Sequence, residues 1–147
     1  GLAARILPSG VASQTTDSFR VEMSGGSSNS FALLISGSAA APANAVNPCF
    51  GLNSGLQAFD GLRCAVQNFL RHGARSIDAN GDVGTGVPGP GNNGWGPPSG
   101  PTGGLIAANG FVPGQTRYFQ AFYRTDIMSG CQTGQNTSQA VEMTVLP

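Results

Sequence analysis

Three oxygen-bearing side chains recur at every second position in one short stretch of the chain. Asp78, Asn80 and Asp82 stand in the segment SIDANGDVG, with the spacing of the first three ligands of an EF-hand calcium loop. Such a loop also needs glycine at its sixth position and glutamate at its twelfth, where this chain has Val83 and Gly89. Calcium is therefore a candidate cofactor only if distant residues complete the coordination shell. No other cofactor is indicated.

The same stretch is also typical of a tight turn. The dipeptide Asn80-Gly81 suits the two central positions of a type I′ hairpin turn, which both need a positive φ. We expect this turn in preference to a metal site.

The single histidine, His72, lacks the partners that catalysis requires. A hydrolase would combine it with a nucleophile and an acid, and a zinc site would need several His or Cys ligands. Its sequence neighbours Arg71 and Arg75 instead predict a lowered pKa, because nearby positive charge disfavours the protonated ring. The sequence also places no pair of carboxylates in the manner of a glycosidase. We therefore predict no catalytic residues and expect that the protein is not an enzyme.

The charge of the chain excludes one class of partner and favours another. Only 10% of the 147 residues are charged, and seven arginines balance seven acidic residues to a formal net charge of zero. Nucleic acid is excluded as a partner, because phosphate binding needs a basic surface. Two copies of such a chain would repel each other weakly, so self-association is expected. The chain contains no run of 18 apolar residues, so no membrane span is predicted.

The elements that must position these residues are strands. Lysine is absent and glutamate occurs twice, so helix formers are scarce, whereas alternation of apolar and polar residues is frequent. The sets expected to face inward are Phe19, Val21 and Met23; Phe31, Leu33 and Ile35; Phe119, Ala121 and Tyr123; and Val141, Met143 and Val145. A longer strand over residues 62–77 is expected to bulge or break near Gly73, and a Pro-Gly turn is predicted over residues 113–116.

We predict a single all-β domain over residues 1–147, a two-layer antiparallel β-sandwich with a jelly-roll-like strand order. Residues 1–16 form an N-terminal arm or edge strand. Residues 84–104, rich in Gly and Pro, form a long loop that carries Trp95, the only tryptophan.

Four segments carry a combined pattern. They are GLRC at 61–64, the DANG turn at 78–81, PGQTRYFQAFYRTD at 113–126 and, after a cysteine, NTSQAVEMTVLP at 136–147. In this order they resemble a poorly characterised family of secreted bacterial domains over roughly residues 31 to 147. The resemblance implies an extracellular β-sandwich of the kind found in large surface proteins, and it supplies no catalytic residues. The chain differs from the family pattern by its enlarged loop and by Cys49.

The resemblance also implies a disulfide. In that family the strand that carries Cys64 lies close to the turn that carries Cys131, so Cys64–Cys131 is the expected bridge, with Cys49–Cys64 as the alternative. The chain begins with glycine and shows no signal segment, which is typical of a mature secreted protein. We therefore expect an extracellular location.

Two functions remain on this evidence. The first is a non-enzymatic structural subunit of a filament, tube or sheath, in which residues 2–8 or 140–147 add to the sheet edge of a neighbouring copy. Its candidate assembly residues are Leu2, Ile6 and Trp95. The alternative is a lectin-like module that binds cell-surface glycans, in which Trp95 and Tyr118 stack on sugars and Asp78 and Asp82 hold calcium.

Overall fold

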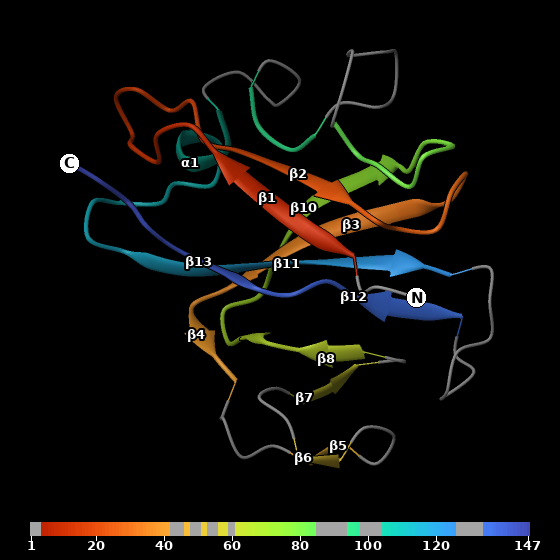
Figure 1. Ribbon diagram of the computed structural model, residues 1–147. Helices are drawn as coiled ribbons and strands as arrows, with labels where there is room; N and C mark the ends of the chain where they lie inside the picture. Colours follow the sequence, from red (N-terminus) through yellow and green to blue (C-terminus); the bar gives the residue numbers. More distant parts are fainter. Residues whose placement is uncertain are drawn as a thin grey trace.

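The computed structural model describes residues 4–41, 46–47, 51–52, 56–58, 61–84, 94–97, 104–125 and 134–147. Over these ranges the chain is an all-β, two-layer antiparallel sandwich, as predicted (Figure 1). Within the same ranges, no helix has the length and apolar character needed to cross a bilayer.

The larger sheet places strands side by side that are distant in the sequence. Its order is β10 (Leu70–Ser76), β3 (Phe31–Gly37) and β11 (Thr116–Arg124). Two short strands then share the free side of β11, with β12 (Gln135–Thr137) paired to its end and β13 (Val141–Thr144) paired to its start. Because β11 pairs with β3 on one side and with β12 and β13 on the other, it is the central strand of the larger sheet.

The smaller sheet consists of β1 (Arg5–Ser9) and β2 (Arg20–Ser24), which cross in front of the larger sheet in Figure 1. The other side of β2 forms antiparallel bridges with Val83 and with Trp95. Both sides of β2 are therefore occupied by main chain.

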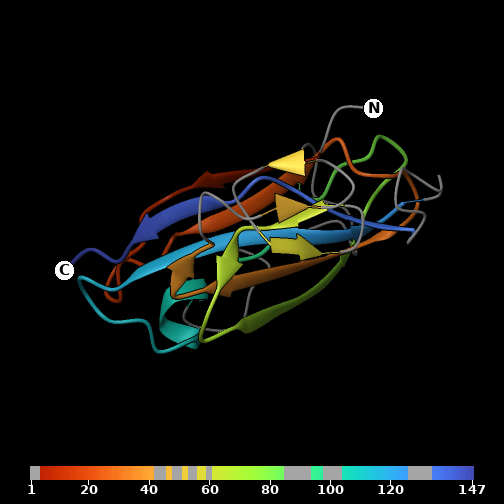
Figure 2. The same cartoon turned by 90° about the horizontal axis from the view of Figure 1, so that it is seen from below.

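Short elements fill the space around the two sheets. They are β4 (Ala39–Ala40) paired with β9 (Ala65–Val66), β5 (Val46–Asn47) paired with β6 (Gly51–Leu52), β7 (Leu56–Ala58) paired with β8 (Gly61–Arg63), and the helix α1 (Gly104–Ala108). Figure 2, which views the sandwich from below, shows the β4–β9 region in front of the larger sheet. The two faces of that sheet therefore have different cover: the smaller sheet on one, and short strands on part of the other.

The alternation predicted three of the four inward faces correctly. Phe19, Val21 and Met23 are buried in the core, and so are the predicted residues of β11, while Met143 and Val145 are buried with Val141 packed against the same cluster.

The prediction for β3 was wrong. Its core-facing residues are Ala32 and Leu34, and Phe31 is 59% exposed on the opposite face. Ile35 is also buried, but on that opposite face, which the β4–β9 region covers near Gly37. A strand that is covered on both faces at one end carries apolar residues in both registers, so alternation could not identify its core side.

Both predicted backbone irregularities are present. The pairing of β10 with β3 shifts register between Arg71 and Ala74, around Gly73 with its φ of 92°. The Pro-Gly turn spans Val112 to Gln115, one residue earlier than predicted, and is closed by a hydrogen bond of 3.0 Å from Gln115 N to Val112 O, with Gly114 at a φ of 81°.

Side chains occupy the outer edge of β1. The Gln139 amide forms two hydrogen bonds with Ile6, accepting from its N–H at 3.1 Å and donating to its carbonyl at 2.9 Å. Two residues earlier, Ala4 N–H donates to the Tyr123 hydroxyl at 3.3 Å, and two residues later Pro8 has no N–H. In a strand, the main-chain N–H groups of every second residue face the same edge. On this edge those residues are Ala4, Ile6 and Pro8, so the edge offers no unused donor from Ala4 to Pro8.

We predict that Gln139→Ala lowers the free energy of unfolding by about 1–2 kcal/mol, because two hydrogen bonds to the main chain of Ile6 are lost. The free energy of unfolding of Gln139→Glu should fall between those of the native protein and Gln139→Ala, since a carboxylate accepts from Ile6 N–H but cannot donate to the Ile6 carbonyl. Urea unfolding followed by Trp95 fluorescence measures both. Equal stability of all three proteins would contradict the role assigned to this amide.

Candidate functional site

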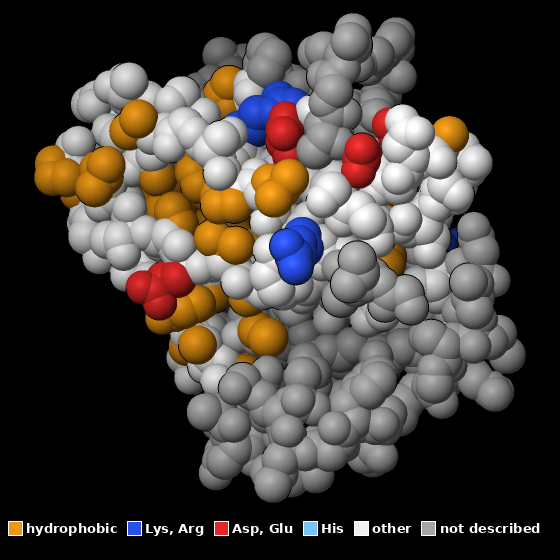
Figure 3. All heavy atoms as spheres, in the orientation of Figure 1, with side chains coloured by type: hydrophobic (Ala, Val, Ile, Leu, Met, Phe, Trp, Pro, Cys, Tyr) orange, Lys and Arg blue, Asp and Glu red, His pale blue; other side chains and the backbone are white. Residues whose placement is uncertain are grey.

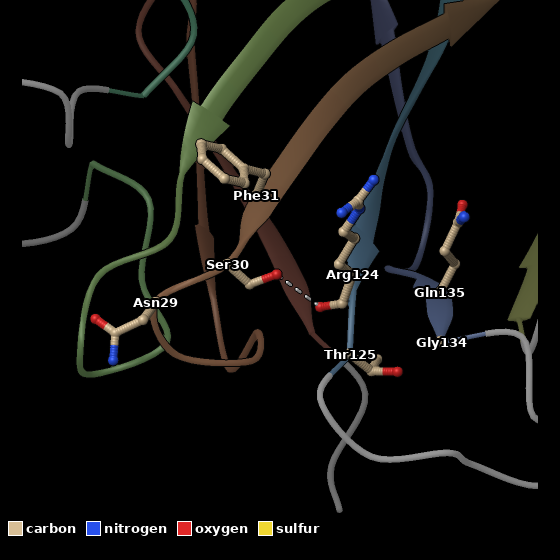
Figure 4. A pocket seen from close by; sticks show the side chains of 7 residues that line it. All are labelled: Asn29, Ser30, Phe31, Arg124, Thr125, Gly134 and Gln135. Carbon is tan, nitrogen blue, oxygen red and sulfur yellow. Dashed lines mark hydrogen bonds between the residues drawn. The ribbon is translucent and has the colours of Figure 1, made fainter.

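A hollow of about 480 Å³ opens at the end of the larger sheet, where β3 begins and β11 ends (Figure 4). Its described lining residues are Asn29, Ser30, Phe31, Arg124, Thr125, Gly134 and Gln135. They come from three neighbouring strands and the turns that flank them. The hollow is therefore built on the rigid part of the fold.

Three of the lining side chains stand in one row across the sheet. Arg124 on β11 pairs with Gln135 on β12, and the pairing of Tyr123 with Ala32 places Phe31 on β3 beside Arg124 on its other side. Residues that pair across strands point to the same face, and in Figure 4 all three side chains rise from that face. An aromatic ring, a guanidinium and an amide therefore lie next to one another.

Hydrogen bonds hold the backbone beneath this row. Ser30 Oγ donates to the Arg124 carbonyl at 3.2 Å, and Thr125 N–H donates to the Gly134 carbonyl at 3.0 Å. Asn29, at a left-handed φ of 56°, donates its N–H to the Asp78 carbonyl. The side chains of the hollow thus project from fixed positions.

The electrostatics of the hollow are one-sided. Among its described lining residues Arg124 carries the only charge, and its guanidinium forms no ion pair with any residue in the described ranges. An exposed guanidinium without a carboxylate partner can accept an anionic group from a ligand.

A second polar cluster is buried in the sandwich. His72 Nε2 lies 2.8 Å from Ser36 Oγ, and Arg117 donates to the same oxygen at 3.0 Å and to the Asn68 carbonyl at 2.9 Å. The Arg117 guanidinium also stacks over Phe111, with its central carbon 4.9 Å from the ring centroid. Ser36 is fully buried, so the Ser–His pair is placed to join strands and not to meet a substrate.

The pKa of His72 is lowered to about 4, first by burial and second by the positive charge of Arg117. The predicted direction was right, but the cause is not the flanking Arg71 and Arg75. Arg117 comes from the neighbouring region of the fold, 45 positions away in the sequence. Arg117 links β11 to β3 and to the segment before β10, and its partners are neutral oxygens and an aromatic ring.

The segment around Asp78, Asn80 and Asp82 is a turn of another type than predicted. Gly81 N–H donates to the Asp78 carbonyl and Asp78 N–H donates to the Asp82 carbonyl, so three residues form the loop. Only Gly81 has a positive φ, which fits a type I turn with a glycine bulge and not type I′.

The Asp78 carboxylate is engaged by this turn. Its Oδ1 accepts hydrogen bonds from the N–H groups of Asn80 at 2.8 Å and Asp82 at 2.9 Å. Within the described part of the chain, no three His, Cys, Asp or Glu side chains gather where they could hold a metal ion. The turn alone accounts for the residue pattern, and calcium stays a prediction.

The sugar-stacking and assembly roles predicted for Trp95 were wrong. Its side chain is fully buried, its indole N–H donates to the Gly73 carbonyl at 2.7 Å, and its main chain pairs with Val21. Tyr118 lies on the opposite face of β11 from the core, beside its cross-strand neighbour Glu142, whose interaction with the hydroxyl raises the pKa of Tyr118. The structure therefore does not bring the two rings together.

The predicted assembly residues do not form a docking edge. Ile6 is buried in the core, and its main chain is bonded to Gln139, so addition of a neighbouring strand at this edge is blocked. Leu2 lies outside the described residues.

Of the predicted bridge, only Cys64 lies within the described residues. It is half-buried, and burial raises the pKa of its thiol. Cys49 and Cys131 lie outside the described residues, so Cys64–Cys131 stays a prediction.

Sequence analysis missed Phe31 as an exposed aromatic and Arg124 as its neighbour. The alternation predicted that Phe31 faces the core. The signal that could have found them is the polar stretch SSNS before Phe31, which places this end of the strand at the surface.

We predict that the protein loses stability as the pH falls from 6.5 toward 4. The pKa of His72 is lower in the folded chain than the unfolded value of 6.5, so the unfolded chain binds the extra proton in this window. The stability is fully present above pH 6.5, and up to about 3 kcal/mol is lost by pH 4. Urea unfolding at several pH values should show a steeper loss in the native protein than in His72→Gln. Identical pH profiles would contradict the assignment.

We also predict that Asp78→Ala lowers the free energy of unfolding by about 1–2 kcal/mol, whereas Asp82→Ala changes it by less than half as much, because only the Asp78 carboxylate accepts the two turn N–H groups. Millimolar calcium should leave the melting temperature of the native protein unchanged. A calcium-induced rise that disappears in both variants would establish a metal site instead.

Comparisons of the chain with protein-family models, with curated proteins and with solved structures found no match. The resemblance to secreted bacterial domains thus stays an expectation based on motifs, and the function is argued from the geometry.

Proposed function

We propose that the protein is a non-enzymatic structural subunit of an extracellular assembly, and that copies associate through an apolar surface at one end of the sandwich. This apolar end consists of Val11, Val112 and Leu146, which are 41%, 53% and 51% exposed. The clustering of these side chains on a chain without net charge is the observation that carries the proposal.

Hydrogen bonds between loops unite the apolar end. Leu146 N–H donates to the Ala12 carbonyl at 2.7 Å, and Gly114 N–H donates to the Val145 carbonyl at 2.8 Å. The loops that carry the three apolar side chains are thereby joined. Hydrophobic side chains are visible at the C-terminal end and over β1 and β13 in Figure 3.

A second copy of the chain is the occupant that these features favour. Exposed aliphatic side chains are stabilised by about 25 cal/mol for each Å² removed from water. The chain has equal numbers of acidic and basic residues, so bringing two copies together costs little electrostatic work. Since the β1 edge is closed by side chains, association of this kind joins surfaces and does not extend a sheet.

We predict that sedimentation velocity of the native protein shows species larger than the monomer, whose fraction grows with concentration. The double variant Val112→Ser, Leu146→Ser should weaken this association by at least about tenfold, because each serine removes apolar contact area. Leu70→Ser, at 37% exposure elsewhere on the surface, is the matched control and should associate like the native protein. A native protein that stays monomeric at all concentrations, or equal loss in the control, would refute the proposal. Negative-stain microscopy of the larger species distinguishes filaments or tubes from closed oligomers.

A further inference from the structure

We infer that the hollow at Phe31 and Arg124 binds a sugar ring that carries a carboxylate, such as a hexuronate unit of an acidic polysaccharide. This inference goes beyond self-association and does not depend on it. It also places carbohydrate recognition on a different aromatic residue from Trp95, which is buried.

The charge of the hollow selects an anion. Arg124 presents a planar fork of N–H donors from the end of a strand, with no carboxylate among the described lining residues to neutralise it. The fork matches the two oxygens of a carboxylate, and such paired, charge-assisted hydrogen bonds are stronger than neutral ones.

The apolar side of the hollow selects a ring. The Phe31 side chain is 59% exposed, the largest exposed fraction among the large hydrophobic residues in the described ranges. It lies one strand away from Arg124, about 4.8 Å across the sheet, so one ligand ring can contact the phenyl face while its carboxylate meets the guanidinium. The next row on the same face, Leu33 and Phe122, continues the apolar surface toward the middle of the sheet.

The remaining lining groups suit hydroxyls. The Asn29 and Gln135 amides each contain donors and an acceptor, and they lie on either side of the Phe31–Arg124 pair. A hydroxyl also donates and accepts, so a sugar hydroxyl can hydrogen-bond to an amide such as that of Asn29 in several orientations. The volume of about 480 Å³ lies within the usual range of small-molecule sites.

Simpler ligands use only part of this arrangement. Acetate or phosphate would engage Arg124 but leave the phenyl ring in water, and a neutral hexose would cover the ring but leave the guanidinium without an anion. A carboxylate attached to a sugar ring uses both groups together.

The test is a titration of the isotope-labelled protein, followed by amide proton–nitrogen correlation spectra, with D-galacturonate, D-galactose and acetate as separate probes. We expect saturable shifts for galacturonate, centred on the amides of residues 29–31, 124–125 and 134–135, with a dissociation constant in the millimolar range. Galactose and acetate should each bind at least about tenfold more weakly.

Variants separate the two contacts. Arg124→Gln and Phe31→Ala should each weaken galacturonate binding by roughly tenfold or more, and Arg124→Lys should fall in between because it keeps the charge but not the fork. Arg71→Gln and Phe69→Ala, which change an exposed arginine and a partly exposed phenylalanine elsewhere, are the matched controls. All four residues are at the surface, and the spectrum of each variant shows directly whether it is folded.

Three outcomes would overturn the inference: no saturable shift with galacturonate, acetate binding as tightly as galacturonate, or galactose binding as tightly as galacturonate. Equal loss of binding in the controls would overturn the placement of the site. None of these outcomes bears on self-association at the apolar end, so the two proposals fail separately.

Discussion

Two strands alone do not make a stable sheet in water, and this constraint governs how the β1–β2 pair is held. Besides the packing of its apolar side chains in the core, side-chain hydrogen bonds at both edges help to hold it against the larger sheet. Gln139 bonds to Ile6 on one side of the sandwich, and Trp95 bonds to Gly73 on the other. Both side chains supply donors at positions where a further strand would otherwise have to pair. The core between the sheets, built around Phe19, Phe119 and Met23, is thereby flanked by a side-chain contact on each side.

The same closure determines which surfaces remain for function. With the β1 edge occupied, both of the binding surfaces proposed here lie at the ends of the molecule. The apolar end lies near the start of β11, and the hollow lies at the end of that strand, some 30 Å away for nine residues. The self-association proposed at one end would leave the hollow at the other end open to a ligand, so each copy in such an assembly would present one hollow.

The core-facing side was predicted correctly for strands in which polar and apolar residues alternate strictly. In β2, Arg20 and Glu22 separate the buried residues and form an ion pair with each other on the outer face, so the core side was evident. In β3, apolar residues occupy both faces of the strand. Only the packing of the β4–β9 region over one end shows which face is the core side. The surface roles predicted for Trp95 were wrong because composition cannot show where two main-chain segments approach each other closely. The glycines on either side of it allow that approach, and a Cβ at Gly96 would collide with the Phe19 carbonyl. The link between Ile6 and Gln139 joins positions 133 residues apart and left no local pattern.

One arginine joins the start of the glycine- and proline-rich segment to a later point in it. Arg20 donates to the Gly84 carbonyl and to the Pro97 carbonyl, and the main chains of Gly84 and Gly94 approach so closely that no Cβ would fit between them. The entry and exit of residues 85–93 are thus fixed by groups outside that segment. Closing a loop costs only about 0.6 kcal/mol more for each doubling of its length. This position is therefore suited to carrying inserted peptides, such as epitopes or affinity tags, while the sheets keep their register.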